Sequence, residues 1–155
     1  MSAEFITAEV TKIVKDEKLE FPLNLAMATA WILGNFKGIN LKVLDVTKSS
    51  SLTDFFVLGS ATNPTMAQSM ADEISKQLRA QGYEAISREG SKKGDDWILL
   101  DFGDIIVHIF LDISRNVYDL DNLWENATEV EIPNSYYFSS DDEEKSDDAT
   151  GKSYF

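Results

Sequence analysis

Hydrophobic positions near the start of the chain follow helical spacing. Apolar residues recur three or four positions apart between Glu4 and about Lys18, which predicts an amphipathic helix. Pro22 interrupts this pattern, and Asn24 is the expected N-cap of a second helix that is apolar on nearly every side. Gly38 is well suited to end that helix.

The next segment combines strand and helix signals. Two strands are predicted, at Leu41–Val46 and Phe55–Ala61, and the unbroken apolar run of the second indicates burial on both faces. Asn63 and Pro64 fit the N-cap and first position of a helix that continues to about Ala80.

The remaining pattern completes an α/β fold. It predicts a short strand at Tyr83–Ser87, a hairpin of Trp97–Phe102 and Ile105–Phe110 around Gly103, and a short helix or turn at Tyr118–Trp124. This order of elements predicts a single mixed β-sheet of about five strands with helices packed on one face.

The hairpin has two faces of different character, because alternate residues of a strand point to opposite sides. One face is wholly apolar and is expected to pack against the helices. The other is predicted to combine large, polar and acidic side chains, namely Trp97, Leu99, Asp101, Ile106, His108 and Phe110. Such a mixture is typical of a recognition surface, although another element of the same chain could instead cover it.

Charge and composition disfavour or exclude several classes of function. The net charge of −13, from 14 basic and 27 acidic residues, disfavours direct nucleic-acid binding and favours a basic protein partner, or serves solubility alone. The absence of cysteine excludes disulfides and thiolate metal sites and fits a reducing compartment. No targeting signal and no apolar run of about 20 residues is visible, so we expect a cytoplasmic protein without a membrane span.

The composition changes after Ala127. From Glu129 to Phe155 the chain has eight acidic and two basic residues and little hydrophobic periodicity, which predicts a solvated, disordered tail. The expected organisation is an N-terminal helical segment at 1–21, a domain at 22–127 and an acidic tail at 128–155.

The sequence gives only weak evidence for a catalytic motif. His108 is the only histidine, so a histidine pair within the chain is excluded. Gly59 and Ser60 before a helix resemble the opening of a nucleotidyltransferase nucleotide site. However, the acids that follow, Asp72 and Glu73, are adjacent on a helix and diverge by about 100°. We therefore predict no metal site, no cofactor and no enzymatic activity.

Six blocks of the sequence carry a resemblance to a known family. In order they are Leu44–Val46, Ser50–Asn63, Ala71-Asp72, Arg88–Gly90, Asp96–Phe110 and Tyr118–Trp124. Together they closely resemble the ribosomal silencing factor, or Iojap-like, family. The resemblance implies a nucleotidyltransferase-like fold without catalytic acids. It also implies docking on the large ribosomal subunit through its ribosomal protein number fourteen, which blocks joining of the small subunit and represses translation.

The resemblance and the hairpin pattern together give a set of expected partner-facing residues. They are Asp54, Phe55, Thr62, Asn63, Trp97, Leu99, Asp101, Asp104, Ile106 and His108. Trp97 is the expected energetic anchor, and Asp101 and Asp104 are expected to pair with basic groups.

Other functions stay open at this point. The chain could be an assembly factor or adapter on the same ribosomal surface, or it could form a homodimer through the mixed face. A divergent nucleotidyltransferase with Asp45, Asp54 or Asp101 as metal ligands is the least favoured alternative.

Overall fold

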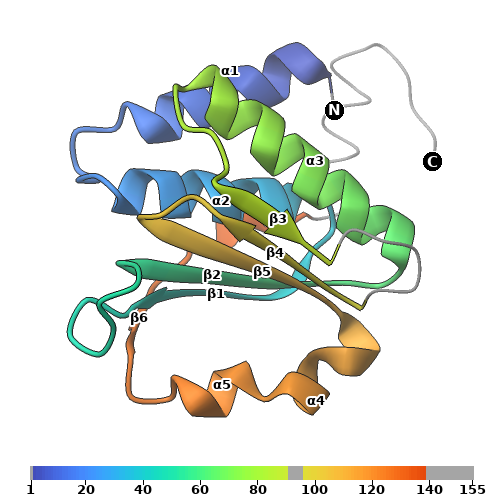
Figure 1. Cartoon of the computed structure of the whole chain (residues 1–155). Helices are drawn as coiled ribbons and strands as arrows, with labels where there is room; N and C mark the ends of the chain where they lie inside the picture. Colours follow the sequence, from blue (N-terminus) through green and yellow to red (C-terminus); the bar gives the residue numbers. More distant parts are fainter. Residues whose placement is uncertain (1, 91–95, 139–155) are drawn as a thin grey trace.

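A mixed six-stranded sheet runs through the molecule, with the strand order β3-β4-β5-β2-β1-β6 (Figure 1). This computed structural model describes residues 2–90 and 96–138. The strands are β1 Ile39–Asp45, β2 Phe55–Ala61, β3 Ser87–Glu89, β4 Trp97–Asp101, β5 Ile105–Leu111 and β6 Thr128–Val130. The α/β class and the single mixed sheet are thus confirmed, with one strand more than the approximate prediction.

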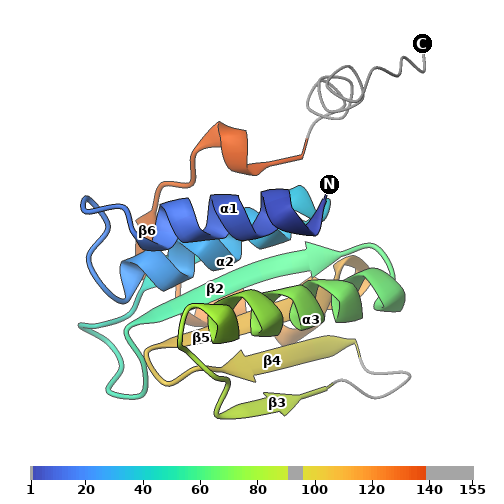
Figure 2. The same cartoon turned by 90° about the horizontal axis from the view of Figure 1, so that it is seen from above.

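Three long helices pack on one side of the sheet: α2 and α3 lie on the strands, and α1 packs on these two helices (Figure 2). They are α1 Ala3–Val14, α2 Leu23–Asn35 and α3 Pro64–Ala80. The central helix, α2, is buried along most of its length, as its apolar sequence predicts. None of the helices in the described ranges is long and apolar enough to cross a membrane.

Helix α1 is joined to α3 by side-chain hydrogen bonds as well as by apolar packing. Its buried residues include Ile6 and Val10. The amide of Gln77 donates to Thr7 Oγ1 at 3.2 Å, and the amide of Gln81 donates to Thr11 Oγ1 at 2.8 Å. The N-terminal helix is therefore part of the packed helical layer.

The start of α3 matches the sequence prediction, whereas the start of α2 does not. Asn63 caps α3, since its side chain accepts a hydrogen bond from the backbone N–H of Met66 at 2.8 Å. Asn24, however, lies inside α2, and Pro22 occupies the N-cap. The Asn24 amide instead donates to the carbonyl of Val14 at 2.9 Å and so links the end of α1 to the start of α2.

The hairpin has the predicted register. Trp97 pairs with Phe110, Leu99 with His108, and Asp101 with Ile106, so these six side chains share a face. The turn between the strands contains Gly103 with a φ of +85°, a conformation that favours glycine. The opposite, apolar side of the hairpin packs into the core beneath the helices.

Two segments near the C-terminus require corrections. Residues 128–138 were expected to belong to a disordered tail, but they contain β6, which pairs antiparallel with β1, and a short 3-10 helix, η2, at Asn134–Tyr136. Residues 139–155 lie outside the described residues. In addition, the 3-10 helix η1 Asp112–Ser114 and the helices α4 Arg115–Tyr118 and α5 Leu120–Leu123 lie on the sheet face opposite α1–α3 (Figure 1). The helices are therefore not confined to one face.

Candidate partner-binding face

Only half of the second sheet face is open, because a segment of the chain covers the other half. This segment, residues 112–127, is called the strap here and contains η1, α4 and α5. Its residues Leu120, Trp124 and Ala127 pack on an apolar cluster of the sheet that includes Phe56, Leu58 and Phe110. The alternative that another element covers the mixed face is thus correct for one half of it.

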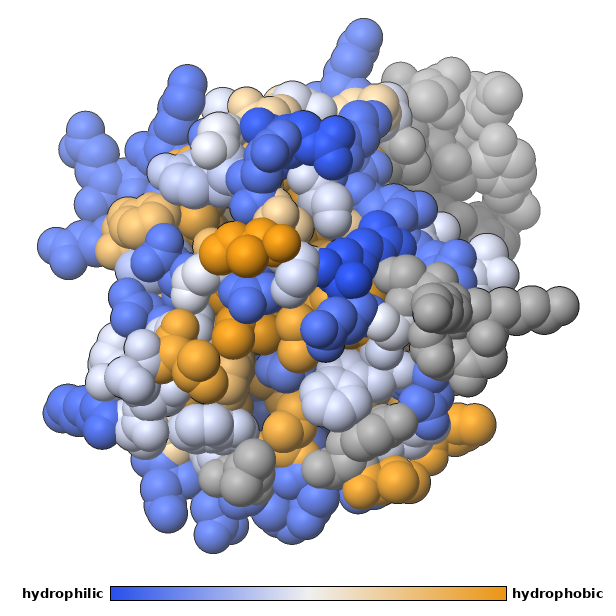
Figure 3. All heavy atoms as spheres, viewed as in Figure 1, coloured by the Kyte–Doolittle hydropathy of each residue, from blue (hydrophilic) through white to orange (hydrophobic). Residues whose placement is uncertain are grey.

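The uncovered half is called the open face and consists of Trp97, Leu99, Asp101 and Ile106. All four side chains are half-buried, and they come from β4 and β5. Figure 3 shows the side of the molecule on which β3 and β4 lie in Figure 1, where several groups of apolar side chains are visible among polar ones. The open face thus combines apolar area with a carboxylate, as the hairpin pattern predicts.

Trp97 is fixed in place by its neighbours. Its indole N–H donates a hydrogen bond to Nδ1 of His108 at 3.1 Å, and its ring stacks on Phe110 with the centroids 5.3 Å apart. Phe56 packs edge-on against His108 and against Trp124, at 5.2 and 4.9 Å. This aromatic cluster joins the open face to the strap-covered half and makes Trp97 a rigid anchor.

His108 lies beneath the open face and is not part of its surface. It is only 5% exposed, and burial, with a smaller contribution from Arg115, lowers its pKa to about 4. Because Nδ1 accepts from Trp97, the proton of the neutral ring is on Nε2, which is buried without a hydrogen-bond partner among the described residues. His108 therefore positions Trp97, and a direct partner contact at His108 is not supported.

The strap is held by a buried arginine that the sequence analysis did not identify. Arg115 is 2% exposed and donates to both carboxylate oxygens of Asp121, at 3.0 and 3.1 Å. It also donates to Ser60 Oγ at 2.9 Å and to the carbonyl of Asn40 at 2.7 Å. Lys42 adds an ion pair to Asp121 at 2.9 Å. These contacts connect the strap with β1 and β2.

The ion pair favours the ionised form of Asp121. Hydrogen bonds from Arg115 make the largest contribution, and those from Lys42 add to it, so that the pKa of Asp121 falls to about 2. The signal for this arrangement in the sequence is weak. Asp121 lies within the matched block Tyr118–Trp124 and Arg115 lies just before it, but no periodicity indicates that the arginine is buried.

The acidic residues expected at the interface gather at the turn end of the hairpin. Asp101 accepts a hydrogen bond from the N–H of Gly103 at 2.8 Å, which orders the turn. The N–H of Asp54 donates to the carbonyl of Asp104 at 3.1 Å, so the backbones of these two residues are adjacent. Asp104 is exposed, and Asp54 and Asp101 are half-buried, which leaves negative charge beside Ile106.

Three other expected contact residues lie elsewhere. Phe55 is 7% exposed and belongs to the core on the helix-covered side, so its expected partner contact is not supported by the structure. Thr62 and Asn63 are exposed and follow the end of β2 that is level with Trp97, but β2 is separated from β4 by β5, and Asn63 caps α3. The structure therefore groups Trp97, Leu99, Asp101, Asp104 and Ile106, with Asp54 next to them.

Among the three aspartates considered as metal ligands, Asp54 and Asp101 lie near the hairpin turn, whereas Asp45 is hydrogen-bonded to Thr47. Asp45 accepts hydrogen bonds from the backbone and side chain of Thr47, and these lower the pKa of Asp45. Over the described ranges, no group of three histidine, aspartate or glutamate side chains is arranged to hold a metal ion.

Comparison with known proteins agrees with the resemblance noted in the sequence. The family described as "Ribosomal silencing factor during starvation" matches residues 20–154, which is most of the chain. The chain belongs to the ribosomal silencing factor family. The family match begins beyond α1, and β6 lies within the matched residues.

Curated relatives carry matching names. The chain is 36% identical over 119 residues to "Protein Iojap, chloroplastic" from Zea mays, covering 76% of this chain but only 49% of that protein. It is 35% identical over 92 residues to "Ribosomal silencing factor RsfS" from Haemophilus influenzae, covering 59% of this chain and 89% of that protein. The chain therefore spans about half of the plant protein and most of the bacterial one.

Solved structures share the fold. A Bacillus halodurans protein superimposes with a TM-score of 0.59 at 30% identity, over 71% of this chain and 96% of that chain. A Chromobacterium violaceum protein gives a TM-score of 0.58 at 24% identity, over 77% of this chain and 86% of that chain, and supports the fold alone.

Proposed function

We propose that this silencing-factor family member binds the large ribosomal subunit through its open face and thereby blocks joining of the small subunit. The observation that carries the proposal is the open face itself: Trp97 is held rigidly at one end, Leu99 lies next to it, and Ile106 lies beside carboxylates at the other end. Exposed apolar area around an ordered aromatic anchor favours protein recognition.

The charge of the chain supports a basic partner. Asp101 and Asp104 lie next to the apolar part of the open face, and the whole chain has a net charge of −13. The electrostatic field of this negative charge speeds the approach of a basic protein and repels exposed nucleic-acid backbone. We propose that the direct contact is ribosomal protein number fourteen of the large subunit, as the family resemblance implies.

The proposed mechanism is occupancy of a shared surface. Translation is repressed because the bound factor and the small subunit cannot use the same face of the large subunit at once. No bond is made or broken, so we infer that the protein is not an enzyme, and that it acts where cytoplasmic ribosomes are found. Magnesium-dependent binding of a nucleotide would contradict the non-enzymatic part of this proposal.

A second candidate function has a specific observation in its favour. The chain is 33% identical over 85 residues to a mouse protein named "Mitochondrial assembly of ribosomal large subunit protein 1", covering 37% of that protein. An assembly factor would also bind the large subunit, but it would leave the joining of mature subunits unchanged. A homodimer formed through the open face would instead compete with ribosome binding.

Sedimentation of purified ribosomal subunits under joining conditions tests these functions. The wild type is expected to co-sediment with the large subunit and to lower the joined-ribosome peak. Leu99→Ser, which removes apolar area from the open face, is expected to weaken binding by about tenfold, the equivalent of roughly 1.4 kcal/mol. Ile113→Ser is the matched control, since Ile113 is 88% exposed on the strap and outside the open face.

Each result has a distinct meaning. Equal loss of binding in Leu99→Ser and Ile113→Ser would contradict the open face as the contact. Binding of the wild type without loss of joined ribosomes would favour the assembly function. Failure to bind either subunit would refute a ribosomal role for this chain.

A further inference from the structure

A groove lies at the edge of the sheet farthest from β3, between β6 and η2. It is open to solvent and has a volume of about 420 Å³. Its lining residues come from β1 and from the segment 129–137, and they are Leu41, Glu129, Val130, Glu131, Ile132, Asn134 and Tyr137. No residue of the open face lines this groove, so the inference drawn from it goes beyond the proposed function.

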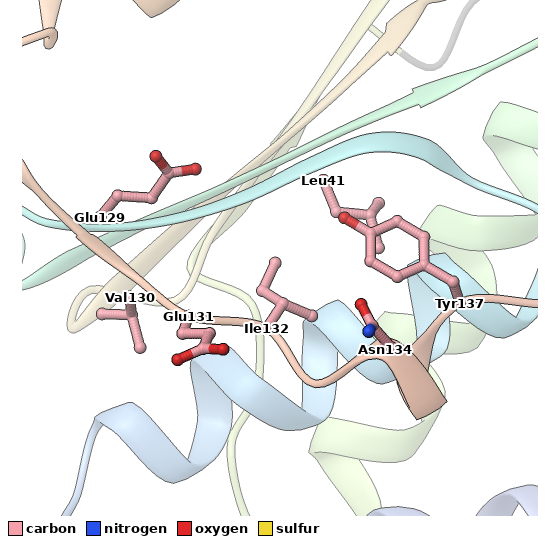
Figure 4. Close-up of a pocket in the computed structure, with 7 residues that line it drawn as sticks. All are labelled: Leu41, Glu129, Val130, Glu131, Ile132, Asn134 and Tyr137. Carbon is pink, nitrogen blue, oxygen red and sulfur yellow. The ribbon is translucent and has the colours of Figure 1, made fainter.

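The lining of the groove combines aliphatic, aromatic and polar side chains. Figure 4 shows Leu41, Ile132, Asn134 and Tyr137 facing a common space, with the carboxylates of Glu129 and Glu131 away from its centre. Because Leu41 is itself packed in the core, the floor of the groove is part of the folded domain. A ligand would meet an aliphatic floor, a phenol ring and two nearby carboxylates.

The wall formed by η2 is firmly attached to the helical layer. The side-chain amide of Asn35 donates to the carbonyl of Tyr136 at 3.0 Å, and the N–H of Phe138 donates to the carbonyl of Gly34 at 2.9 Å. Gly34 contacts the Tyr136 backbone so closely that a Cβ at this position would collide with it. The groove is therefore preformed, which lowers the entropic cost of binding.

The surroundings of the groove are negative. Glu129 and Glu131 are exposed. Burial raises the pKa of the neighbouring Tyr136, and the charges of Asp16 and Glu9 add to this effect. Glu129 and Glu131 line the groove and give it a negative border, so a cationic ligand is the complementary one.

The groove runs beside an open sheet edge. β6 pairs with β1 on one side and ends the strand order, so no further strand among the described residues pairs with its outer side. An extended peptide can add to such an edge through backbone hydrogen bonds while its side chains enter adjacent pockets. This geometry favours a peptide over a compact small molecule.

We propose that the β6 groove binds an extended, arginine-bearing segment of a protein partner. An arginine stem lies against Ile132 and its planar guanidinium stacks on the Tyr137 ring, while Glu129 and Glu131 give the border of the groove a negative charge. Arginine fits better than lysine because stacking on the ring requires a planar group.

Fluorescence anisotropy with a labelled peptide of alternating arginine and valine tests the proposal on the full chain. The double variant Glu129→Gln/Glu131→Gln is expected to raise the Kd about fivefold or more, since both counter-charges are lost. The matched control is Glu84→Gln/Glu89→Gln, which removes two other exposed carboxylates, one of them on β3 at the opposite edge, and should change the Kd less than about twofold.

Two further comparisons locate and identify the interaction. Backbone amide signals of Val130, Ile132 and Asn134 should shift most when the peptide is added to ¹⁵N-labelled protein. A peptide with glutamine in place of arginine should bind far more weakly. The proposal is overturned by equal effects of the two double variants, by signal changes centred on Leu99 and Ile106, by equal binding of the glutamine peptide, or by no binding at all.

Discussion

Removal of the Arg115 guanidinium should be the most damaging single change on the strap. Arg115→Met keeps an apolar stem of similar length but deletes all four hydrogen bonds to Asp121, Ser60 and the Asn40 carbonyl. The side chain is 2% exposed, so water cannot replace these partners without loosening the strap.

The magnitude follows from the burial of the pair. Breaking a buried, hydrogen-bonded ion pair by removing one partner costs about 3–5 kcal/mol, while an exposed pair is worth about 0–1 kcal/mol. Asp121 is 26% exposed and keeps its ion pair with Lys42, so it can be partly rehydrated after the substitution. We therefore expect Arg115→Met to lower the free energy of unfolding by about 3 kcal/mol, at the lower end of that range.

Urea denaturation followed by tryptophan fluorescence measures this change. Arg79→Met is the matched control, because Arg79 is 66% exposed and its ion pair with Glu84 has a longer N–O distance of 3.8 Å. The control should lose less than about 0.5 kcal/mol. Losses of similar size in the two variants would show that the Arg115 network does not hold the strap, and the reasoning would be refuted.

Two predictions concern pH. The pKa of Asp121 is about 2 in the folded chain and ordinarily 3.8, so its ion pair stabilises the fold above pH 4 and this stabilisation is lost between about pH 4 and 2. Asp121→Asn should therefore lower the free energy of unfolding by about 1 kcal/mol near pH 7, a value reduced for solvent exposure. In denaturation curves, the difference in stability between the wild type and this variant should shrink below pH 4. A difference that stays constant with pH would contradict the ion pair. His108 should titrate with a midpoint of about 4 in an NMR titration, and the lowered pKa means that folding stability falls as pH drops from about 6.5 to 4. A midpoint near 6.5 would show that the imidazole is solvated.

Elements with strong local signals could be predicted from the sequence. The apolar run Phe55–Ala61 is β2, with every residue buried. Asn63 caps α3 as predicted, because an asparagine followed by proline fixes both the cap and the first turn. The prediction of the two hairpin faces is also confirmed. Side chains alternate between the two faces along a strand, and a short turn leaves little freedom in how the strands are paired.

Elements that depend on distant partners could not be predicted in this way. The strand Thr128–Val130 is short, contains a glutamate and has no alternation of its own; it is a strand because its backbone pairs with β1. Asn24 has the residue type of a cap, but its side chain bonds to Val14 across the helix connection. The burial of Arg115 likewise depends on Ser60 and Asn40, which are far away in the sequence.

The strap explains why the candidate site occupies one part of the sheet face. Without it, the apolar strip formed by Phe56, Leu58 and Phe110 would lie open beside Trp97, and the exposed apolar area would be much larger. Arg115 fixes the strap over that strip, while Trp97 packs against its edge through Phe110. The same contacts that stabilise the fold therefore define where the open face ends, so a partner can bind Leu99, Ile106 and the neighbouring carboxylates without displacing the strap.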